Sequence, residues 1–188
     1  MNKIIGINIL GLILLFSCEA ENIIKDKREY RENDKPEIPS ARELNMNGDT
    51  LVDFTIEYGE GVADGVDTFY YFITGGIHPE GTNEILRQEN YNLLFSKAGD
   101  TIFREYSDKI WEGQFSSLIS ITSDFSYWNN EWRIGHNDTE ANNFLVFKIN
   151  NITPSLIGWM NINLNPQTGE IDIIDFNSSH QSTMIVGQ

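Results

Sequence analysis

Cysteine is almost absent from this chain of 188 residues, which contains one. A single cysteine excludes a disulfide framework within the chain and any paired-cysteine metal or redox motif. Basic residues are also scarce, because 13 Lys and Arg stand against 28 Asp and Glu, for a formal net charge of −15. This acidity opposes electrostatic attraction to nucleic acid or to an anionic lipid surface. We therefore expect no nucleic-acid partner.

A sustained helical pattern is missing as well. After about residue 42, no window of twelve or more residues shows a clean apolar stripe at helical spacing. Hydrophobic residues nevertheless make up 40% of the chain and aromatic residues 12%, which is enough for a packed core. The length favours one domain.

The first residues have the composition of an export signal. Met1–Lys3 is short and basic, and residues 4–16 are almost wholly apolar. Thirteen helical residues span about 20 Å, less than a bilayer core of ~30 Å, so the segment fits the apolar region of a signal peptide. Leu15-Phe16-Ser17-Cys18 follows and resembles the lipobox of bacterial lipoproteins. The resemblance implies cleavage of residues 1–17 and acylation of Cys18; the alternative is a free cysteine at the end of an uncleaved anchor helix.

Acyl chains on Cys18 would fix the protein to a membrane. The Asn- and Ile-rich composition and the Glu19-Ala20-Glu21 start resemble lipoproteins of Bacteroidota. That resemblance implies a cell-envelope location in the outer membrane, on its periplasmic face or at the cell surface.

Residues 18–42 are predicted to be the lipidated N-terminus and a charged, flexible linker. They hold two runs of mixed charge, followed by Pro36 and Pro39. The alternative is a short exposed helix over residues 23–31. Most of the excess negative charge then belongs to the predicted domain, residues 43–188.

The domain has the pattern of an all-β protein. Short segments alternate between apolar and polar residues, and turn residues separate them. The clearest hairpin pairs residues 157–164 with 170–176 across an Asn165–Gly169 turn, while Gly75-Gly76 is expected to end the strand over residues 68–74. We predict an antiparallel β-sandwich or open barrel. The other expected strands are residues 52–58, 83–87, 92–95, 101–104, 118–122 and 144–149.

The end of the chain resembles small β-domains of secreted and lipid-anchored Bacteroidota proteins. Gly158-Trp159 and Thr168–Ile173 provide this resemblance. It implies a fold and an extracytoplasmic setting, and no activity.

One loop at the start of the domain is a candidate calcium site. Residues 45–53 are similar to the calcium loops of β-propeller repeats, in which alternate positions supply the oxygen ligands that Ca²⁺ prefers. Thr50 departs from that pattern, which has glycine there. The alternative is a plain Asn-Gly turn without metal. No other cofactor is expected. The calcium ligands would be Asn45, Asn47, Asp49, Asp53 and the carbonyl of Leu51.

Catalytic motifs are not found. His78, His136 and His180 lack zinc-site spacing, and we expect His78 and His136 to lie in surface loops. The chain has neither a nucleophile elbow nor a phosphate-binding loop. No catalytic residue is assigned, although an acidic pair could still serve an extracytoplasmic hydrolase, for example one directed at glycans.

Aromatic residues gather in one polar stretch, residues 125–133. Tyr127, Trp128 and Trp132 lie among amides and charges there, a composition suited to stacking on sugar rings. The alternative places Trp128 and Trp132 in the core. The sequence therefore favours a lipid-anchored cell-envelope protein whose β-domain has a binding or structural role without chemistry, with a glycan or an envelope protein as partner.

Overall fold

The computed structural model describes residues 35–188 except 66–67, 90–92, 124–127 and 135–142. The described residues form strands and no helix, so the predicted all-β class is confirmed. The strands are β1 (Arg42–Leu44), β2 (Phe54–Gly65), β3 (Thr68–Pro79), β4 (Glu84–Gln88), β5 (Phe95–Ser96), β6 (Thr101–Phe103), β7 (Lys109–Glu112), β8 (Ser116–Thr122), β9 (Arg133–Ile134), β10 (Phe144–Ile149), β11 (Leu156–Leu164), β12 (Ile171–Ser179) and β13 (Thr183–Ile185).

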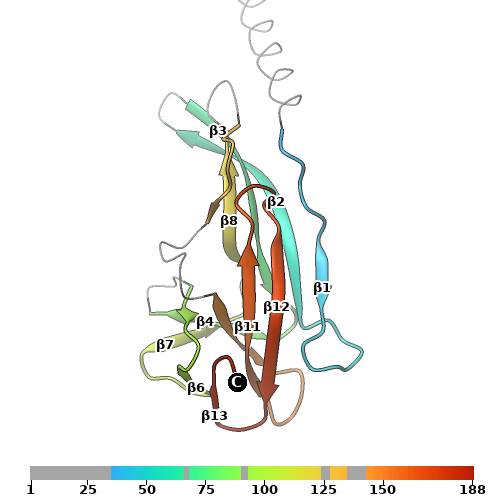
Figure 1. The fold of residues 1–188 in the computed structure, drawn as a ribbon, viewed down its shortest axis with the longest axis vertical. Coiled ribbons are helices and arrows are strands. Elements are labelled where there is room, and N and C mark those ends of the chain that lie inside the picture. The colour runs from blue at the N-terminus through green and yellow to red at the C-terminus, as the bar shows by residue number, and fades with distance from the viewer. Residues whose placement is uncertain (1–34, 66–67, 90–92, 124–127, 135–142) are drawn as a thin grey trace, which may run out of the picture.

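The strands form antiparallel sheets that do not close into a barrel, consistent with a β-sandwich (Figure 1). Sheet A has the order β1-β2-β3-β8-β9, and sheet B has the order β12-β11-β10-β4-β7, with β5 also paired to β10. A small sheet C consists of β13 and β6. β1 and β12 are therefore edge strands, one in each large sheet.

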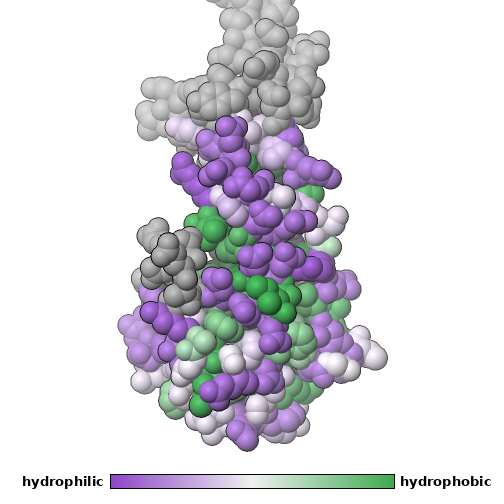
Figure 2. Space-filling model, in the orientation of Figure 1, coloured by the Kyte–Doolittle hydropathy of each residue, from purple (hydrophilic) through white to green (hydrophobic). Residues whose placement is uncertain are grey.

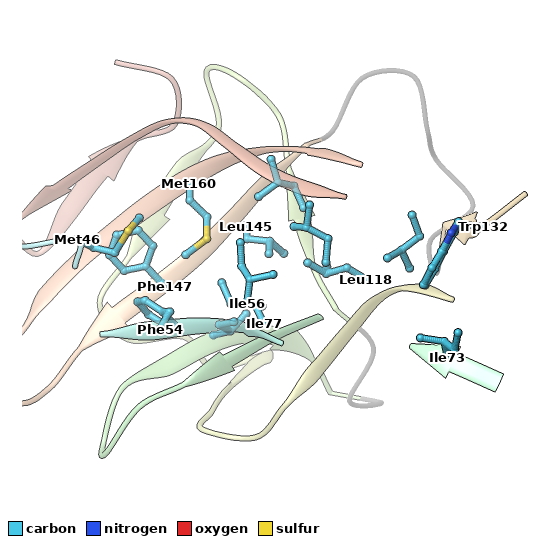
Figure 3. Packing of buried hydrophobic residues seen from close by; sticks show 14 of the residues in the cluster. Met46, Phe54, Ile56, Ile73, Ile77, Leu118, Trp132, Leu145, Phe147 and Met160 are labelled. Carbon is cyan, nitrogen blue, oxygen red and sulfur yellow. The ribbon is translucent and has the colours of Figure 1, made fainter. Parts of the chain in front are cut away.

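The main hydrophobic core lies between sheets A and B. Phe54 of β2 and Phe147 of β10 are fully buried and meet edge to face, with ring centroids 5.4 Å apart. Figure 3 shows the core running from Met46 and these two rings at one end to Trp132 at the other. Burial of this many large side chains is the dominant favourable contribution to folding.

A second, smaller core lies on the other face of sheet B, beneath sheet C. Val146 and Trp159 belong to it, together with Ile102 of β6 and Val186 after β13. Sheet B is thus covered on both faces. This explains why β10 is apolar nearly throughout, since Leu145 and Val146 face different cores.

The β2–β3 hairpin is the longest in the described part of the chain, and the end of β2 and the start of β3 lie beyond the β11–β12 turn (Figure 1). The prediction that Gly75-Gly76 ends the strand is wrong, because β3 continues to Pro79. Gly75 pairs across the ladder with Tyr58, and a Cβ on Gly75 would lie 2.4 Å from that ring. The Tyr58 ring therefore covers the glycine and replaces the missing side chain in the packing.

Most strand predictions are confirmed, including β10 at its predicted bounds and the β11–β12 hairpin. Gly169 takes a φ of +78° in the turn between them. β1, β7, β9 and β13 were not predicted.

The described residues include no helical segment with the length and hydropathy of a membrane span.

Candidate functional site

The predicted calcium ligands come together in one loop between β1 and β2. The side-chain oxygens of Asn45 and Asn47 accept hydrogen bonds from the backbone N–H groups of Gly48 and Asp49. Both carboxylate oxygens of Asp49 are also engaged, one by the N–H of Leu51 at 2.7 Å and the other by the Asn47 amide at 3.0 Å. The loop is therefore held by its own hydrogen bonds, as in the Asn-Gly turn alternative.

Asp53 is the buried end of this loop. Its side chain is fully buried, and its Oδ2 accepts a 2.8 Å hydrogen bond from the Met46 N–H. The amide nitrogens of Asn47, Asn83 and Asn151 lie 3.4–3.5 Å from its Oδ1. A buried carboxylate needs such donors, because desolvation without them is costly. Asp53 thus anchors the loop to the sandwich.

A Ca²⁺ ion in this loop would compete with N–H donors for the carboxylate oxygens of both aspartates. In the described part of the chain, no group of three or more His, Cys, Asp or Glu side chains is placed to hold a metal ion. Calcium binding remains a prediction from the sequence.

Of the three aromatic residues predicted to bind a sugar, the two that the structure describes lie in the core. Trp128 and Trp132 are 8% and 3% exposed, which agrees with the core alternative, and Tyr127 lies outside the described residues. A Cβ on Gly169 would lie 2.3 Å from the Trp132 indole, so the backbone of the β11–β12 turn covers that ring. The exposed stacking surface expected at Trp128 and Trp132 is not formed, because their rings fill the end of the sandwich.

A groove of about 680 Å³ lies at the seam where the edges of sheets A and B meet. One wall is the segment before and into β1, residues 36–42, and the other is the β11–β12 turn with the start of β12. Ile56, Tyr58 and Trp132 also line it. We call this feature the seam groove. Its polar lining residues are Glu37, Ser40, Arg42, Gln167, Thr168, Glu170 and Asp172.

Arg42 connects the two walls of the seam groove. Its Nη2 donates a 2.7 Å hydrogen bond to the Ile171 carbonyl, and its Nη1 lies 3.7 Å from Asp172. β1 is an edge strand of sheet A and β12 is an edge strand of sheet B, so this contact joins the two sheets at the groove.

Tyr58 supports the groove from sheet A. Its hydroxyl donates a 3.1 Å hydrogen bond to the Gly169 carbonyl, and its ring meets Trp132 edge to face at 6.3 Å. Burial raises the pKa of Tyr58, while a backbone hydrogen bond from Ile171 and the charge of Arg42 oppose the rise. The phenol therefore stays neutral at physiological pH and keeps its donor role.

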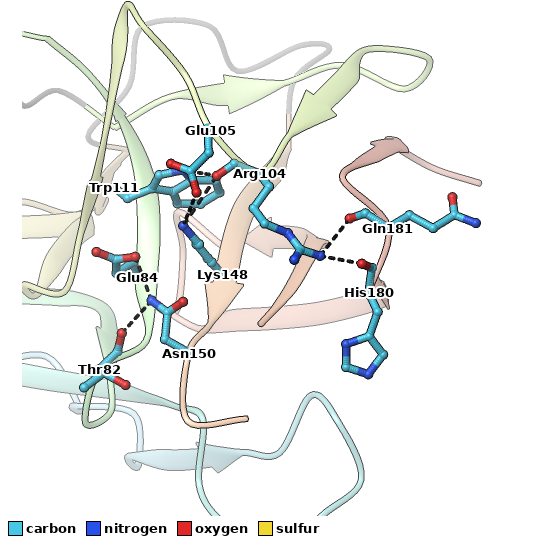
Figure 4. Close-up of polar contacts among 9 residues, drawn as sticks. All are labelled: Thr82, Glu84, Arg104, Glu105, Trp111, Lys148, Asn150, His180 and Gln181. Carbon is cyan, nitrogen blue, oxygen red and sulfur yellow. Dashed lines mark hydrogen bonds and ion pairs between the residues drawn. The ribbon is translucent and has the colours of Figure 1, made fainter. Parts of the chain in front are cut away.

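A second polar cluster fastens the loop after β6 to sheet B (Figure 4). The Lys148 ammonium lies 3.1 Å from Glu105, 3.4 Å from the Arg104 carbonyl and 5.5 Å from the centre of the Trp111 ring. Arg104 also donates to the carbonyls of His180 and Gln181, next to β13. These contacts hold together segments that are distant in sequence, and so they stabilise the fold.

The histidines are dispersed. His78 lies in β3 and not in the expected loop, with its Nδ1 3.7 Å from Glu57. His180 is exposed between β12 and β13, and its Nδ1 lies 2.9 Å from the Pro154 carbonyl. His136, like Cys18, lies outside the described residues.

The seam groove is not predicted by the sequence pattern. Its lining comes from segments more than a hundred residues apart, and residues 36–41 have the composition of a linker. Pro36 and Pro39 are the one sequence signal of this groove wall, because they indicate an extended backbone.

Comparison with known proteins found no matching family model, no similar curated protein and no similar solved structure.

Proposed function

We propose that this protein is a lipid-anchored cell-envelope protein whose β-sandwich binds a ligand in the seam groove without chemical conversion. The observation that supports the proposal most is the position of the groove on the chain. The segment that leads from the lipobox cysteine is continuous with the groove wall formed by residues 36–42. Anchor and binding site are therefore joined by a short stretch of chain.

The length of that stretch limits the distance from the membrane. Sixteen residues, 19–34, separate Cys18 from Lys35, and a fully extended chain of this length spans at most about 55 Å. A ligand in the seam groove would thus be held near the membrane that the acyl chains enter. This favours a partner in the envelope itself, either a glycan or a protein.

The side chains around the groove favour binding over catalysis. Arg42 and Tyr58 both bridge the two sheets through hydrogen bonds to carbonyl groups of the opposite wall. Such contacts fix the shape of a site, and a preformed site loses less entropy when a ligand binds.

Lipidation is tested by replacing the lipobox cysteine. Cys18→Ala should abolish incorporation of radiolabelled palmitate and leave the chain uncleaved or cleaved at another position. Ser17→Ala is the matched control, because a small residue is kept before the cysteine, and it should be labelled like the wild type. Continued labelling and normal cleavage of the Cys18→Ala protein would disprove the anchor.

A further inference from the structure

The edge of β2 is paired over only a quarter of its length on the side of the groove. β1 pairs with Phe54, Thr55 and Ile56, whereas within the described part of the chain residues 57–65 pair only on the other side, with β3. Pro36 and Pro39 explain why the preceding segment does not extend the ladder, since proline has no N–H to donate. A free edge of this kind is where an additional strand can pair.

The seam groove reaches β2 at Ile56 and Tyr58, where the unpaired edge begins, and it is acidic. Its lining includes three carboxylates, those of Glu37, Glu170 and Asp172, and one guanidinium. That guanidinium, on Arg42, already contacts Asp172 and a carbonyl group. A ligand with positive charge would therefore match the groove better than a neutral or acidic one.

The chain itself contains an example of such a contact. The Lys35 ammonium lies 2.6 Å from the Glu60 carboxylate, so a lysine on an extended segment reaches the unpaired part of β2. In the face that Figure 2 shows, the coloured surface at the top, towards the end of the β2–β3 hairpin, is mainly hydrophilic. Such a surface suits recognition by charge and by backbone hydrogen bonds.

We propose that an extended peptide segment rich in Lys or Arg binds at the seam groove and adds as a strand to β2 beyond Ile56, where one of its basic side chains takes the place of Lys35 on Glu60. Backbone hydrogen bonds to the free edge would supply part of the affinity, and the carboxylates would select basic side chains. The volume of about 680 Å³ lies within the usual range for ligand sites. This inference rests on the proposed binding role of the groove, and it names the class of partner.

A second copy of the chain fits this edge less well. Pairing of β2 with β2 from another molecule would bring Glu57 and Glu60 of both copies onto one short ladder. Like charges in such positions are destabilising. The charges therefore favour a basic partner.

Binding can be measured with the full chain in non-ionic detergent and the peptide Ac-Lys-Val-Lys-Val-Lys-amide, by titration calorimetry. We expect saturable binding that weakens with salt, and no binding of Ac-Glu-Val-Glu-Val-Glu-amide. Glu37→Gln with Glu170→Gln should weaken binding about threefold to tenfold, because two exposed ion pairs are lost. Glu89→Gln with Asp108→Asn, two exposed residues near the opposite edge of sheet B, is the charge-matched control and should bind like the wild type.

Strand addition is tested separately from charge by two N-methylated versions of the lysine peptide, one methylated at the valines and one at the lysines. Alternate N–H groups of a strand point to opposite sides, so one version should lose binding about tenfold or more and the other should retain it. Equal binding of both would overturn strand addition, and equal binding of the glutamate peptide would overturn the charge preference. A dimer whose contact protects β2 would assign the edge to a second copy. Absence of peptide binding by a protein that is still acylated at Cys18 would overturn this inference and leave the anchor intact.

Discussion

The two ends of β2 differ in burial and in strand pairing, although they belong to one strand. At one end Phe54 and Ile56 are buried in the main core and paired with strands on both sides. At the other end the Glu60 side chain is 53% exposed, Val62 is 55% exposed, and the described residues pair with the strand on one side only. The difference separates two roles: the first end stabilises the fold, and the second end has the unpaired edge at which we propose that a peptide binds.

The largest effect is expected from a large-to-small change at the buried end. Phe54→Ala removes a ring that contacts Phe147 and should lower the free energy of unfolding by about 3–5 kcal/mol. Val62→Ala, at the other end of the same strand, should change it by less than about 0.5 kcal/mol. Urea unfolding followed by tryptophan fluorescence measures both; similar losses for the two variants would contradict the division of β2.

A smaller loss is expected from the loop that leads into the buried end. Asp53→Ala leaves the Met46 N–H and the surrounding amides without their acceptor, and should lower the free energy of unfolding by about 2–3 kcal/mol. Asp49→Ala, whose side chain is exposed, should lower it by about 1 kcal/mol or less. If the exposed aspartate proved the more costly to remove, a ligand on the loop would be indicated.

Tyr58 stands at the boundary between the two ends. Tyr58→Phe removes the hydrogen bond to Gly169 and should lower the free energy of unfolding by about 0.5–1.5 kcal/mol at neutral pH. Because burial raises the pKa of Tyr58 in the folded state, the unfolded chain ionises first as the pH rises above about 10, and stability falls there. The Phe variant should lose less stability than the wild type between neutral pH and pH 11. Parallel pH profiles would show that Tyr58 does not contribute.

Calcium should have the smallest effect. Since N–H donors already occupy the carboxylate oxygens of Asp49 and Asp53, the melting temperature should be the same in millimolar Ca²⁺ and in EDTA. An ion that binds only the folded state must raise the melting temperature. A rise with Ca²⁺ that disappears in Asp49→Ala would establish the loop as a metal site.

The sequence predicts the strands that have a strong pattern. β10 is apolar nearly throughout because both faces of sheet B are covered, and the β11–β12 hairpin has a glycine that its turn requires. β1 and β13 are three residues each, too short for a pattern; β1 forms on the edge of the long strand β2, and β13 pairs with β6, which is equally short. β3 runs through Gly75 because a ring from the neighbouring strand covers the glycine, which no local rule predicts.

The candidate site could be predicted only in part. The calcium-loop residues were found because they are consecutive, and their burial and bonding were not accessible from the sequence. Trp132 was identified, but its aromatic neighbour Tyr58 is more than seventy residues away. The seam groove depends on a contact between Arg42 and Ile171, which is a property of the tertiary fold.

Hydrogen–deuterium exchange on the full chain, with and without Ac-Lys-Val-Lys-Val-Lys-amide, tests the division of β2 most directly. Without peptide, the amides of residues 54–56 should exchange slowly and those of residues 57–63 that face the free edge should exchange fast. With peptide, exchange should slow in residues 57–63 and stay unchanged in residues 54–56. Slow exchange along all of β2 without peptide, or peptide protection that appears only outside β2 and the seam groove, would contradict the account.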